Sequence, residues 1–444
     1  MQQLVVVFVE YADPDLNWGT DVYEDDDPQD GLPLPNMYIC NYNRFKKSKL
    51  VELQITPALL NSLLVAQRGT YIIEDRESAV DLDIQHWLLN HNMTETDLLR
   101  ELAPTCEEMI VTVKTKLRFN GKSNFQGDGD NFCSLRFANG DDVDVSYHYG
   151  RRSGKCMYIR FSDRVDVTEP GPYGGISILL DALSHEYIPT VMNNYLDFGF
   201  MIRLSYGANS NVGNVLNVAP GFHTWVGVQR RRLTYKKSTD LLPVNDEPPN
   251  CVKDPKLRVL KDSYYSVDMC LADCNLYVIA QRCNCSDSVR PSVKYRQCEM
   301  QDDPCVQKEM TMTERAFVHR CNVECEPQCV YDEADVSVSY NRIIALPQVS
   351  SLPLALQRYN HSVPKDQDEN IASYNFAQLD VYYRTLSVLV IEKYKINTLV
   401  DLMSQVGGSL GFWLGASLIT LVHLVYSVID AIGEWLQRKF DAKS

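Results

Sequence analysis

The segment Gly407–Ser417 (GGSLGFWLGAS) holds residue types that could coordinate a small cation within an apolar stretch. Gly415, Ala416 and Ser417 are small, and glycine tolerates a break in a helix. Such a break would turn backbone carbonyls and the Ser417 hydroxyl towards a central axis, where oxygen atoms can replace the hydration shell of a cation. Irregular backbone at membrane depth is tolerated only where it lines water or is buried in protein. The segment therefore predicts a cation-selecting site.

Helix packing is the simpler explanation for the glycines. Gly407, Gly411 and Gly415 are spaced by four residues, so on a helix they share one face that another helix can approach closely. A nucleophile elbow does not fit, because the final glycine of Gly-x-Ser-x-Gly is missing and no strand precedes it. No Ser/His/Asp or His-Glu-x-x-His pattern supports a hydrolase. We therefore expect no enzyme activity, no metal site, and no cofactor other than a permeant small cation.

The segment Leu410–Ile429 is long and apolar enough to predict a transmembrane helix, which needs roughly 20 such residues. His423 is its one titratable residue. Trp435 follows at the expected interface, and three basic residues lie beyond it: Arg438, Lys439 and Lys443. Positive charge beyond a span marks the cytoplasmic side. We thus predict a pore-lining helix at 399–430, a cytoplasmic tail at 431–444, and an extracellular body before them; a buried core helix is the alternative.

Cysteine usage supports an extracellular body. Ten of the fourteen cysteines lie between Cys251 and Cys329, a density typical of disulfide-bonded proteins in an oxidising compartment. Zinc is the competing interpretation of these spacings. However, the segment contains no Cys-x-x-Cys pair, and His319 is its one histidine. Disulfides are therefore the prediction.

Glycosylation signals and charge point the same way. Asn-x-Ser/Thr sequons begin at Asn92, Asn284 and Asn360. The middle sequon lies between cysteines, so we predict glycosylation at Asn92 and Asn360. The net charge of -15 excludes nucleic acid as a partner, because phosphate binding needs a basic surface. An acidic surface instead attracts cations.

The start of the chain predicts little by itself. Leu4–Val9 is apolar, but it is too short for a span and lacks the basic residues of a signal peptide. We expect residues 1–12 to be the remnant of a first transmembrane helix whose upstream part is missing; a buried strand is the alternative. The acidic stretch Asp21–Asp30 reads as a solvated loop.

Between these ends, residues 13–398 predict a mixed α+β extracellular domain with a cysteine-rich segment at about 236–335. Helical spacing of apolar residues occurs in 58–67, 84–90 and 265–283, and the last of these places Cys270 and Cys274 on one face. Alternation typical of strands occurs in 109–119, 142–149, 156–162, 200–206, 223–229 and 368–393.

Several segments, in order along the chain, resemble one family. Leu34–Leu50 is similar to the signature that follows the first helix in the superfamily of epithelial sodium channels, degenerins and acid-sensing channels. Ala219–Tyr235 is similar to its Pro-Gly-Phe segment, and Tyr265–Cys285 with the terminal cysteines 321, 325 and 329 resembles its thumb. Gly407–Ser417 resembles its pore helix with a Gly-x-Ser filter. Together these resemblances span nearly the whole chain.

The resemblance implies an α+β membrane protein. Its large disulfide-rich extracellular domain has a β-rich palm and β-ball with helical finger, thumb and knuckle, between two transmembrane helices of which the first is mostly missing. It assigns the selectivity filter to Gly415, Ala416 and Ser417, pore-helix packing to Gly407, Gly408 and Gly411, and a gating position to Ser404. It also implies the disulfides Cys40–Cys156, Cys106–Cys133, Cys251–Cys329, Cys270–Cys325, Cys274–Cys321, Cys283–Cys305 and Cys285–Cys298.

The function implied is a subunit of a trimeric, amiloride-sensitive, sodium-permeable channel in the plasma membrane. The partners would be lipid, related subunits in a homo- or heterotrimer, and an extracellular proton or peptide; mechanical gating is also open. Many relatives carry carboxylates just inside the filter, where this chain has His423 and Tyr426, so ion selectivity stays open. The alternative is a non-conducting single-span receptor, which leaves Gly407–Ser417 unexplained.

Overall fold

The structure is a computed structural model of the whole chain. It describes residues 18–25, 31–56, 59–60, 80–119, 122–150, 154–162, 165–188, 198–206, 215–235, 251–252, 257–259, 265, 267–286, 295–298, 302, 304–306, 308–309, 325–326, 328–343, 374–395, 399–414 and 418–441. Residues 1–12, Asn360, Cys321 and the filter residues 415–417 lie outside this set.

The chain divides into two compact units. One comprises Tyr23–Arg232 and Val252–Val390, and the other comprises Met1–Val22, Leu233–Cys251 and Ile391–Ser444. The first unit holds nearly all of the described strands and the helices before residue 390. The second holds the C-terminal helices.

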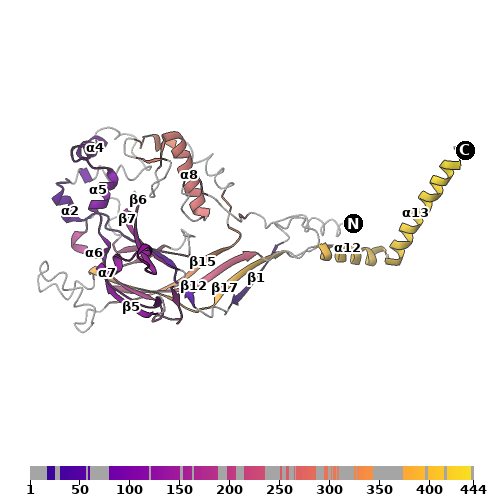
Figure 1. Cartoon of the computed structure of the whole chain (residues 1–444), viewed down its shortest axis with the longest axis horizontal. Helices are drawn as coiled ribbons and strands as arrows, with labels where there is room; N and C mark the ends of the chain where they lie inside the picture. The colour runs from indigo at the N-terminus through magenta and orange to yellow at the C-terminus, as the bar shows by residue number, and fades with distance from the viewer. Residues whose placement is uncertain are drawn as a thin grey trace. The chain divides into compact units, whose positions relative to one another are not determined.

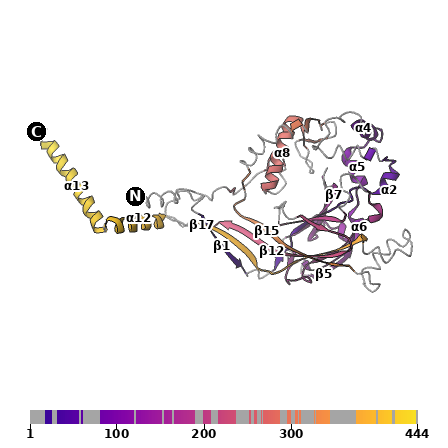
Figure 2. The same cartoon turned by 180° about the vertical axis from the view of Figure 1, so that it is seen from behind.

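The larger sheet has ten strands in the order β1-β17-β12-β16-β9-β4-β8-β2, with β15 paired to β12 and β5 to β4. The central pair β12 and β16 is parallel, with Val226 opposite Val381. Figures 1 and 2 show β15, β12 and β17 side by side. The strands are β1 Trp18–Asp25, β2 Leu32–Pro33, β4 Ile110–Phe119, β5 Lys122–Asp128, β8 Asp166–Val167, β9 Ile176–Asp181, β12 Phe222–Tyr235, β15 Tyr331–Arg342, β16 Phe376–Tyr383 and β17 Val388–Lys395.

A smaller sheet of five strands has the order β11-β10-β3-β7-β6, and all of its pairs are antiparallel. Its strands are β3 Asn36–Asn41, β6 Val143–Gly150, β7 Gly154–Phe161, β10 Phe200–Ser205 and β11 Val215–Val218. Alternate apolar residues of both sheets face a single core, in which Ile39, Ile202, Ile178 and Leu379 are fully buried. The two sheets therefore pack face to face, as period-2 patterning requires.

Short helices α2 Lys47–Glu52, α4 Val80–Asn90 and α5 Glu95–Leu102 form a second, separate core around Leu50, Ile84 and Leu98. They lie beside one another in Figures 1 and 2. Two further short helices, α6 Cys106–Met109 and α7 Gly129–Cys133, accompany the single turns η1 Phe137–Asn139 and η2 Ser184–Glu186. Ile84–Asn90 is helical as predicted; of the predicted helix 58–67, Leu59 and Leu60 are described, and both are helical and buried.

The cysteine-rich segment contains α8 Val267–Cys283, which confirms the helix predicted over 265–283. The short strands β13 Cys285–Ser286 and β14 Arg296–Gln297 follow it. On α8, the buried Asp273 carboxylate accepts the backbone N–H groups of Arg258 (2.6 Å) and Val259 (2.8 Å). This contact fixes the preceding loop against the helix, because a charged acceptor strengthens both hydrogen bonds.

Two predictions about strands were wrong. The strand predicted over 368–393 is two strands, β16 and β17, because the polar sequence Arg384–Ser387 interrupts the alternation, and the Arg384 N–H bonds the carbonyl of Val228. Part of the predicted acidic loop Asp21–Asp30 belongs to strand β1, whose residues 20–25 are all exposed. At a sheet edge, acidic side chains stay solvated while the backbone pairs on one side.

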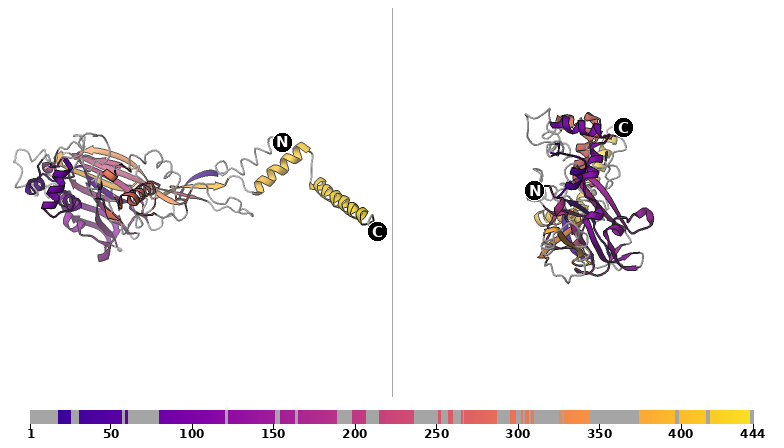
Figure 3. Two further views of the ribbon diagram at one scale, coloured as in Figure 1. Left: turned by 90° about the horizontal axis from the view of Figure 1, so that it is seen from above. Right: turned by 90° about the vertical axis from the view of Figure 1, so that its left-hand side faces the viewer.

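The C-terminal part forms α12 Leu399–Leu414 and α13 Leu418–Asp441, which are drawn as separate ribbons in Figure 3. The predicted apolar segment Leu410–Ile429 is thus divided between the end of one helix and the first half of the next. Helix α13 also continues through most of the predicted tail, since residues 430–441 are largely good helix formers.

Candidate functional site

Helix α12, which contains most of the predicted pore segment, presents an open glycine face in the single chain. A Cβ atom added at Gly407 or Gly408 of α12 would meet no atom within 4 Å. Ser404, which the resemblance assigns to gating, lies one turn earlier on the same helix and is exposed, and Gly411 is half-buried. This face has the small residues that allow another helix to approach its backbone. The predicted filter residues Gly415, Ala416 and Ser417 lie outside the described residues.

Helix α13 exposes apolar side chains along its length. Ile419 is 71% exposed, Val422 61% and Ile429 63%, and His423 and Tyr426 are exposed among them. An apolar surface of this extent marks a site of contact with lipid or another protein. Within the described residues, none of the helices combines the length and the apolarity that crossing a membrane would require.

Strand β17 precedes α12 in the chain and pairs with β12. The Lys393 Nζ of β17 lies 5.7 Å from the centre of the Tyr235 ring at the end of β12, within the range of a cation–π contact. The two strands are thus joined by both backbone pairing and this side-chain contact.

Five disulfides have both cysteines described: Cys40–Cys156, Cys106–Cys133, Cys270–Cys325, Cys283–Cys305 and Cys285–Cys298. These are five of the seven pairs that the resemblance implies. Cys251, Cys274 and Cys329 are also disulfide-bonded, and Cys321 lies outside the described residues, so the other two pairs stay predictions. Cys285, Cys298 and Asp302 lie close together, but the bond between the two cysteines leaves no thiolate for a metal.

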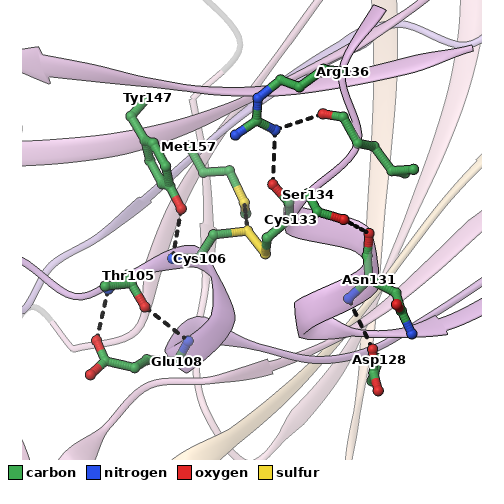
Figure 4. The surroundings of a disulfide bond; sticks show 11 residues. Thr105, Cys106, Glu108, Asp128, Asn131, Cys133, Ser134, Arg136, Tyr147 and Met157 are labelled. Carbon is green, nitrogen blue, oxygen red and sulfur yellow. Dashed lines mark hydrogen bonds between the residues drawn. A yellow bond between two sulfur atoms is a disulfide. The ribbon is translucent and has the colours of Figure 1, made fainter. Parts of the chain in front are cut away.

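Figure 4 shows how the sheet holds the Cys106–Cys133 disulfide. The Cys106 N–H donates to the Tyr147 hydroxyl (3.1 Å), and the Arg136 guanidinium donates to the carbonyl of Cys133 (2.8 Å). Thr105 caps α6 through a capping box with Glu108. The disulfide therefore joins two short helices whose ends are already satisfied by hydrogen bonds.

An arginine network joins the second half of β12 to the start of β15 and to Arg384, the residue after β16. Arg230 and Arg232 both bind the Asp332 carboxylate (2.5 and 2.9 Å). Burial would raise the pKa of Asp332, but the hydrogen bonds from Arg232 and Arg230 outweigh it and hold the pKa below its usual value. Arg231 (3.3 Å) and Arg384 (2.8 Å) share Asp335 in the same way.

The network was not predicted from sequence. Its signal is present in the triplet Arg230–Arg232 and the acidic positions 332 and 335. The sequence shows these charges but does not show that strands about 100 residues apart pair and bring them together.

A second polar line crosses the outer face of the large sheet. The Asp380 carboxylate lies 2.8 Å from His223 Nε2 and accepts the indole N–H of Trp225 (3.1 Å). Gln378 donates to the other carboxylate oxygen (3.2 Å) and to the Ser177 hydroxyl (2.5 Å). Burial opposes the charge, yet the contact with His223 and these hydrogen bonds hold the pKa of Asp380 below its usual value.

Two buried tyrosines tie the sheets together. The hydroxyls of Tyr206, just after β10, and Tyr383, on β16, are 2.7 Å apart, and Tyr383 donates to the carbonyl of Pro33 (2.5 Å). The Arg230 guanidinium lies 5.3 Å from the Tyr206 ring centre. Burial raises the pKa of both tyrosines, so both stay neutral hydrogen-bonding groups.

Comparison with known proteins places this geometry in a family. The profile of the family described as amiloride-sensitive sodium channel matches residues 2–427. The chain is 27% identical over 299 residues to acid-sensing ion channel 2 of Danio rerio, covering 64% of the chain and 51% of that protein. It is 24% identical over 433 residues to acid-sensing ion channel 4 of Rattus norvegicus, covering 93% of the chain and 69% of that protein.

Acid-sensing ion channel 1B of Danio rerio is 28% identical over 305 residues, or 63% of the chain and 48% of that protein. The chain thus spans about half to two thirds of the length of these relatives. With a strand-rich, disulfide-bonded body and a match that extends over nearly all of its residues, the chain belongs to the amiloride-sensitive sodium channel family, in the superfamily of epithelial sodium channels, degenerins and acid-sensing channels.

Proposed function

We propose that the chain is a pore-forming subunit of a trimeric, amiloride-sensitive, sodium-permeable channel of the plasma membrane. Family membership supports ion conduction, and the glycine face of α12 is the observation that carries the assignment of the pore. Three copies of α12 could approach one another along Gly407, Gly408 and Gly411 without side-chain clash. The exposed apolar residues of α13 would then contact lipid and neighbouring subunits.

In this proposal, residues 399–430 cross the membrane and Gly415–Ser417 form the filter. Backbone carbonyls and the Ser417 hydroxyl would replace part of the hydration shell of sodium. Beyond the filter, His423 and Tyr426 offer no fixed negative charge, so the filter itself would set selectivity. Residues 13–398 would lie outside the cell, with glycans at Asn92 and Asn360.

The extracellular body would transmit a signal to the pore through the paired strands β12 and β17. The disulfides around α8 stiffen the part of the body that a ligand or force would move. Each arginine pair clamps β12 to β15, and Arg384 adds β16. A rigid sheet of this kind can pass a displacement to Ser404 and the rest of α12; a proton, a peptide or mechanical force would supply it.

Voltage-clamp recording from oocytes that express the full-length chain, alone and with related subunits, tests the proposal. We expect an amiloride-sensitive sodium current that Ser417→Trp abolishes. Ser339→Trp, at an exposed position of β15 outside the proposed pore, is the matched control and should conduct like the unsubstituted chain. Surface-labelled protein without current in any combination would contradict the proposal and support a non-conducting receptor.

A further inference from the structure

Two sequons within the described residues have the same backbone conformation in different surroundings. Asn92 and Asn284 both adopt a left-handed conformation, with φ of 51° and 53°, and both are exposed. Exposure and backbone conformation of the asparagine therefore do not distinguish them as glycosylation sites. What differs is the hydroxyl residue two positions later and the covalent bonds around it.

The first sequon, Asn92-Met-Thr, lies in the turn between α4 and α5. Its hydroxyl residue, Thr94, is exposed and caps α5: the Thr94 hydroxyl donates to the Asp97 carboxylate (2.7 Å) and accepts the Asp97 N–H (3.2 Å). No disulfide with both cysteines described involves residues 80–102. The asparagine and the hydroxyl residue of this sequon are thus both exposed.

The second sequon, Asn284-Cys-Ser, is closed by cross-links. Cys283 is bonded to Cys305, and Cys285, fully buried in the middle of the sequon, is bonded to Cys298. Ser286 is 2% exposed, and its carbonyl accepts the Cys298 N–H (3.0 Å). The hydroxyl that an acceptor sequon must present is buried once these bonds form.

The end of α4 beside Asn92 has an uncovered apolar surface. Leu89 is 77% exposed, and the Asn92 N–H donates to its carbonyl (3.2 Å). The His91 ring stacks on Trp87, with centroids 3.9 Å apart and an interplanar angle of 18°. The apolar face of a sugar ring packs well on aliphatic and aromatic surfaces of this kind, while its hydroxyls stay in water.

We propose that Asn92 carries an N-linked glycan whose first sugars cover Leu89 and the His91–Trp87 stack, and that disulfide formation keeps Asn284 unmodified. Such a glycan is bulky and solubilising. The inference uses the extracellular location of residues 13–398 from the proposed function, but it does not use conduction.

Gel mobility before and after peptide N-glycosidase treatment of the full-length chain from mammalian cells tests occupancy. An Asn360→Asp background removes the third sequon from the count. Asn92→Asp should then abolish the remaining shift in gel mobility on glycosidase treatment, because aspartate tolerates the left-handed conformation but accepts no glycan. Thr94→Ser, which keeps both the sequon and the helix cap, should retain it.

Asn284→Asp should leave mobility unchanged in untreated cells. When dithiothreitol is present during pulse labelling, the parent chain should show a second glycosidase-sensitive mobility shift. Asn284→Asp should not show it. Two results would overturn the proposal. One is a glycosidase-sensitive mobility shift that Asn284→Asp removes without reductant, and the other is a shift that persists in Asn92→Asp.

The covering role has its own readout. Loss of the glycan should increase binding of a hydrophobic dye to the purified chain, and adding Leu89→Ser to Asn92→Asp should reverse that increase. Unchanged dye binding in Asn92→Asp would refute the covering role. Full glycosylation without current would contradict only the proposed function, whereas current from a chain that is unglycosylated at Asn92 would contradict only this inference.

Discussion

The two-sheet core and the α8 region of the same unit achieve order by different means. Between the sheets, aliphatic residues such as Ile39, Ile202 and Leu379 are completely buried. Around α8, the corresponding cluster consists of Ile279, Val306 and two disulfide-bonded cysteines, Cys285 and Cys298. Apolar burial stabilises the first region, whereas cross-links replace much of that burial in the second.

The difference shows how a region with little apolar burial can still be stiff enough to transmit a displacement. A thin core gives a region little resistance to bending, and disulfides restore stiffness by constraining the chain without adding bulk. The thick core between the sheets also has two disulfides, Cys40–Cys156 between β3 and β7 and Cys106–Cys133, but there they add to extensive apolar burial. Removing disulfides and removing buried apolar side chains should therefore affect the two regions differently.

The largest effect is expected from loss of the disulfides around α8. Reducing them, or replacing Cys283 and Cys305 together by serine, should remove about 2–5 kcal/mol of local stability per bond. Amide exchange should show early loss of protection in α8, while β4, β9 and β16 stay protected. The matched control is Cys40→Ser with Cys156→Ser, where backbone pairing persists. Simultaneous loss of protection in both regions would contradict the comparison.

A cavity in the two-sheet core should cost nearly as much. Leu379→Ala should lower the free energy of unfolding by about 2–5 kcal/mol, because Leu379 is completely buried. Val338→Ala, at a position that is 45% exposed on β15, is the control and should change stability little. Chemical denaturation of the solubilised chain measures both. An equal loss for the two variants would argue against a densely packed core.

The boundary between the helical cluster and the sheets depends on one buried cation. The Lys46 N–H donates to the Leu102 carbonyl (2.8 Å), and its ammonium binds both oxygens of Glu108 (2.9 and 3.1 Å). Lys46→Met should cost about 1–2 kcal/mol, a value discounted because the Glu108 side chain is 38% exposed. Lys49→Met, which breaks ion pairs that are largely solvated, should have little effect in the same denaturation experiment.

Local patterns predicted several of the longer elements, but not β3, β9 or β15. Alternation marked β4, β6, β7 and β10 close to their bounds, and the first half of β12, because each strand has one face on the core. Spacing of cysteines at i and i+4 likewise marked α8. A pore segment could be predicted from residue types alone, since Gly407–Ser417 is contiguous in the chain.

What sequence could not predict depends on contacts between distant segments. The parallel pairing of β12 with β16 joins residues about 150 positions apart, and the clamp of Arg230 and Arg232 on Asp332 depends on strand pairing of the same kind. The strands β2 and β8 have two residues each, too few for a period to appear. Strand β1 was not predicted because its acidic side chains are typical of a solvated loop, although an edge strand can also carry them.

The smallest predicted effect concerns acid, and it sharpens the comparison because the arginine network lies in the sheets and not around α8. Hydrogen bonds from arginine hold the pKa of Asp332 below the ordinary value of about 3.9 that it has in the unfolded chain. Its contribution to stability is therefore complete above that value and is lost as the pH falls through the lower folded pKa.

Asp332→Asn should consequently destabilise the chain at pH 7 and flatten the loss of stability as the pH falls below about 4. Asp130→Asn, at an exposed position, is the control and should keep the parent profile. Denaturation midpoints measured across this pH range, with intrinsic fluorescence as the signal, give the answer. If Asp332→Asn and the parent lose stability in parallel as the pH falls, the clamp of Arg230 and Arg232 contributes nothing to the acid response of the sheets.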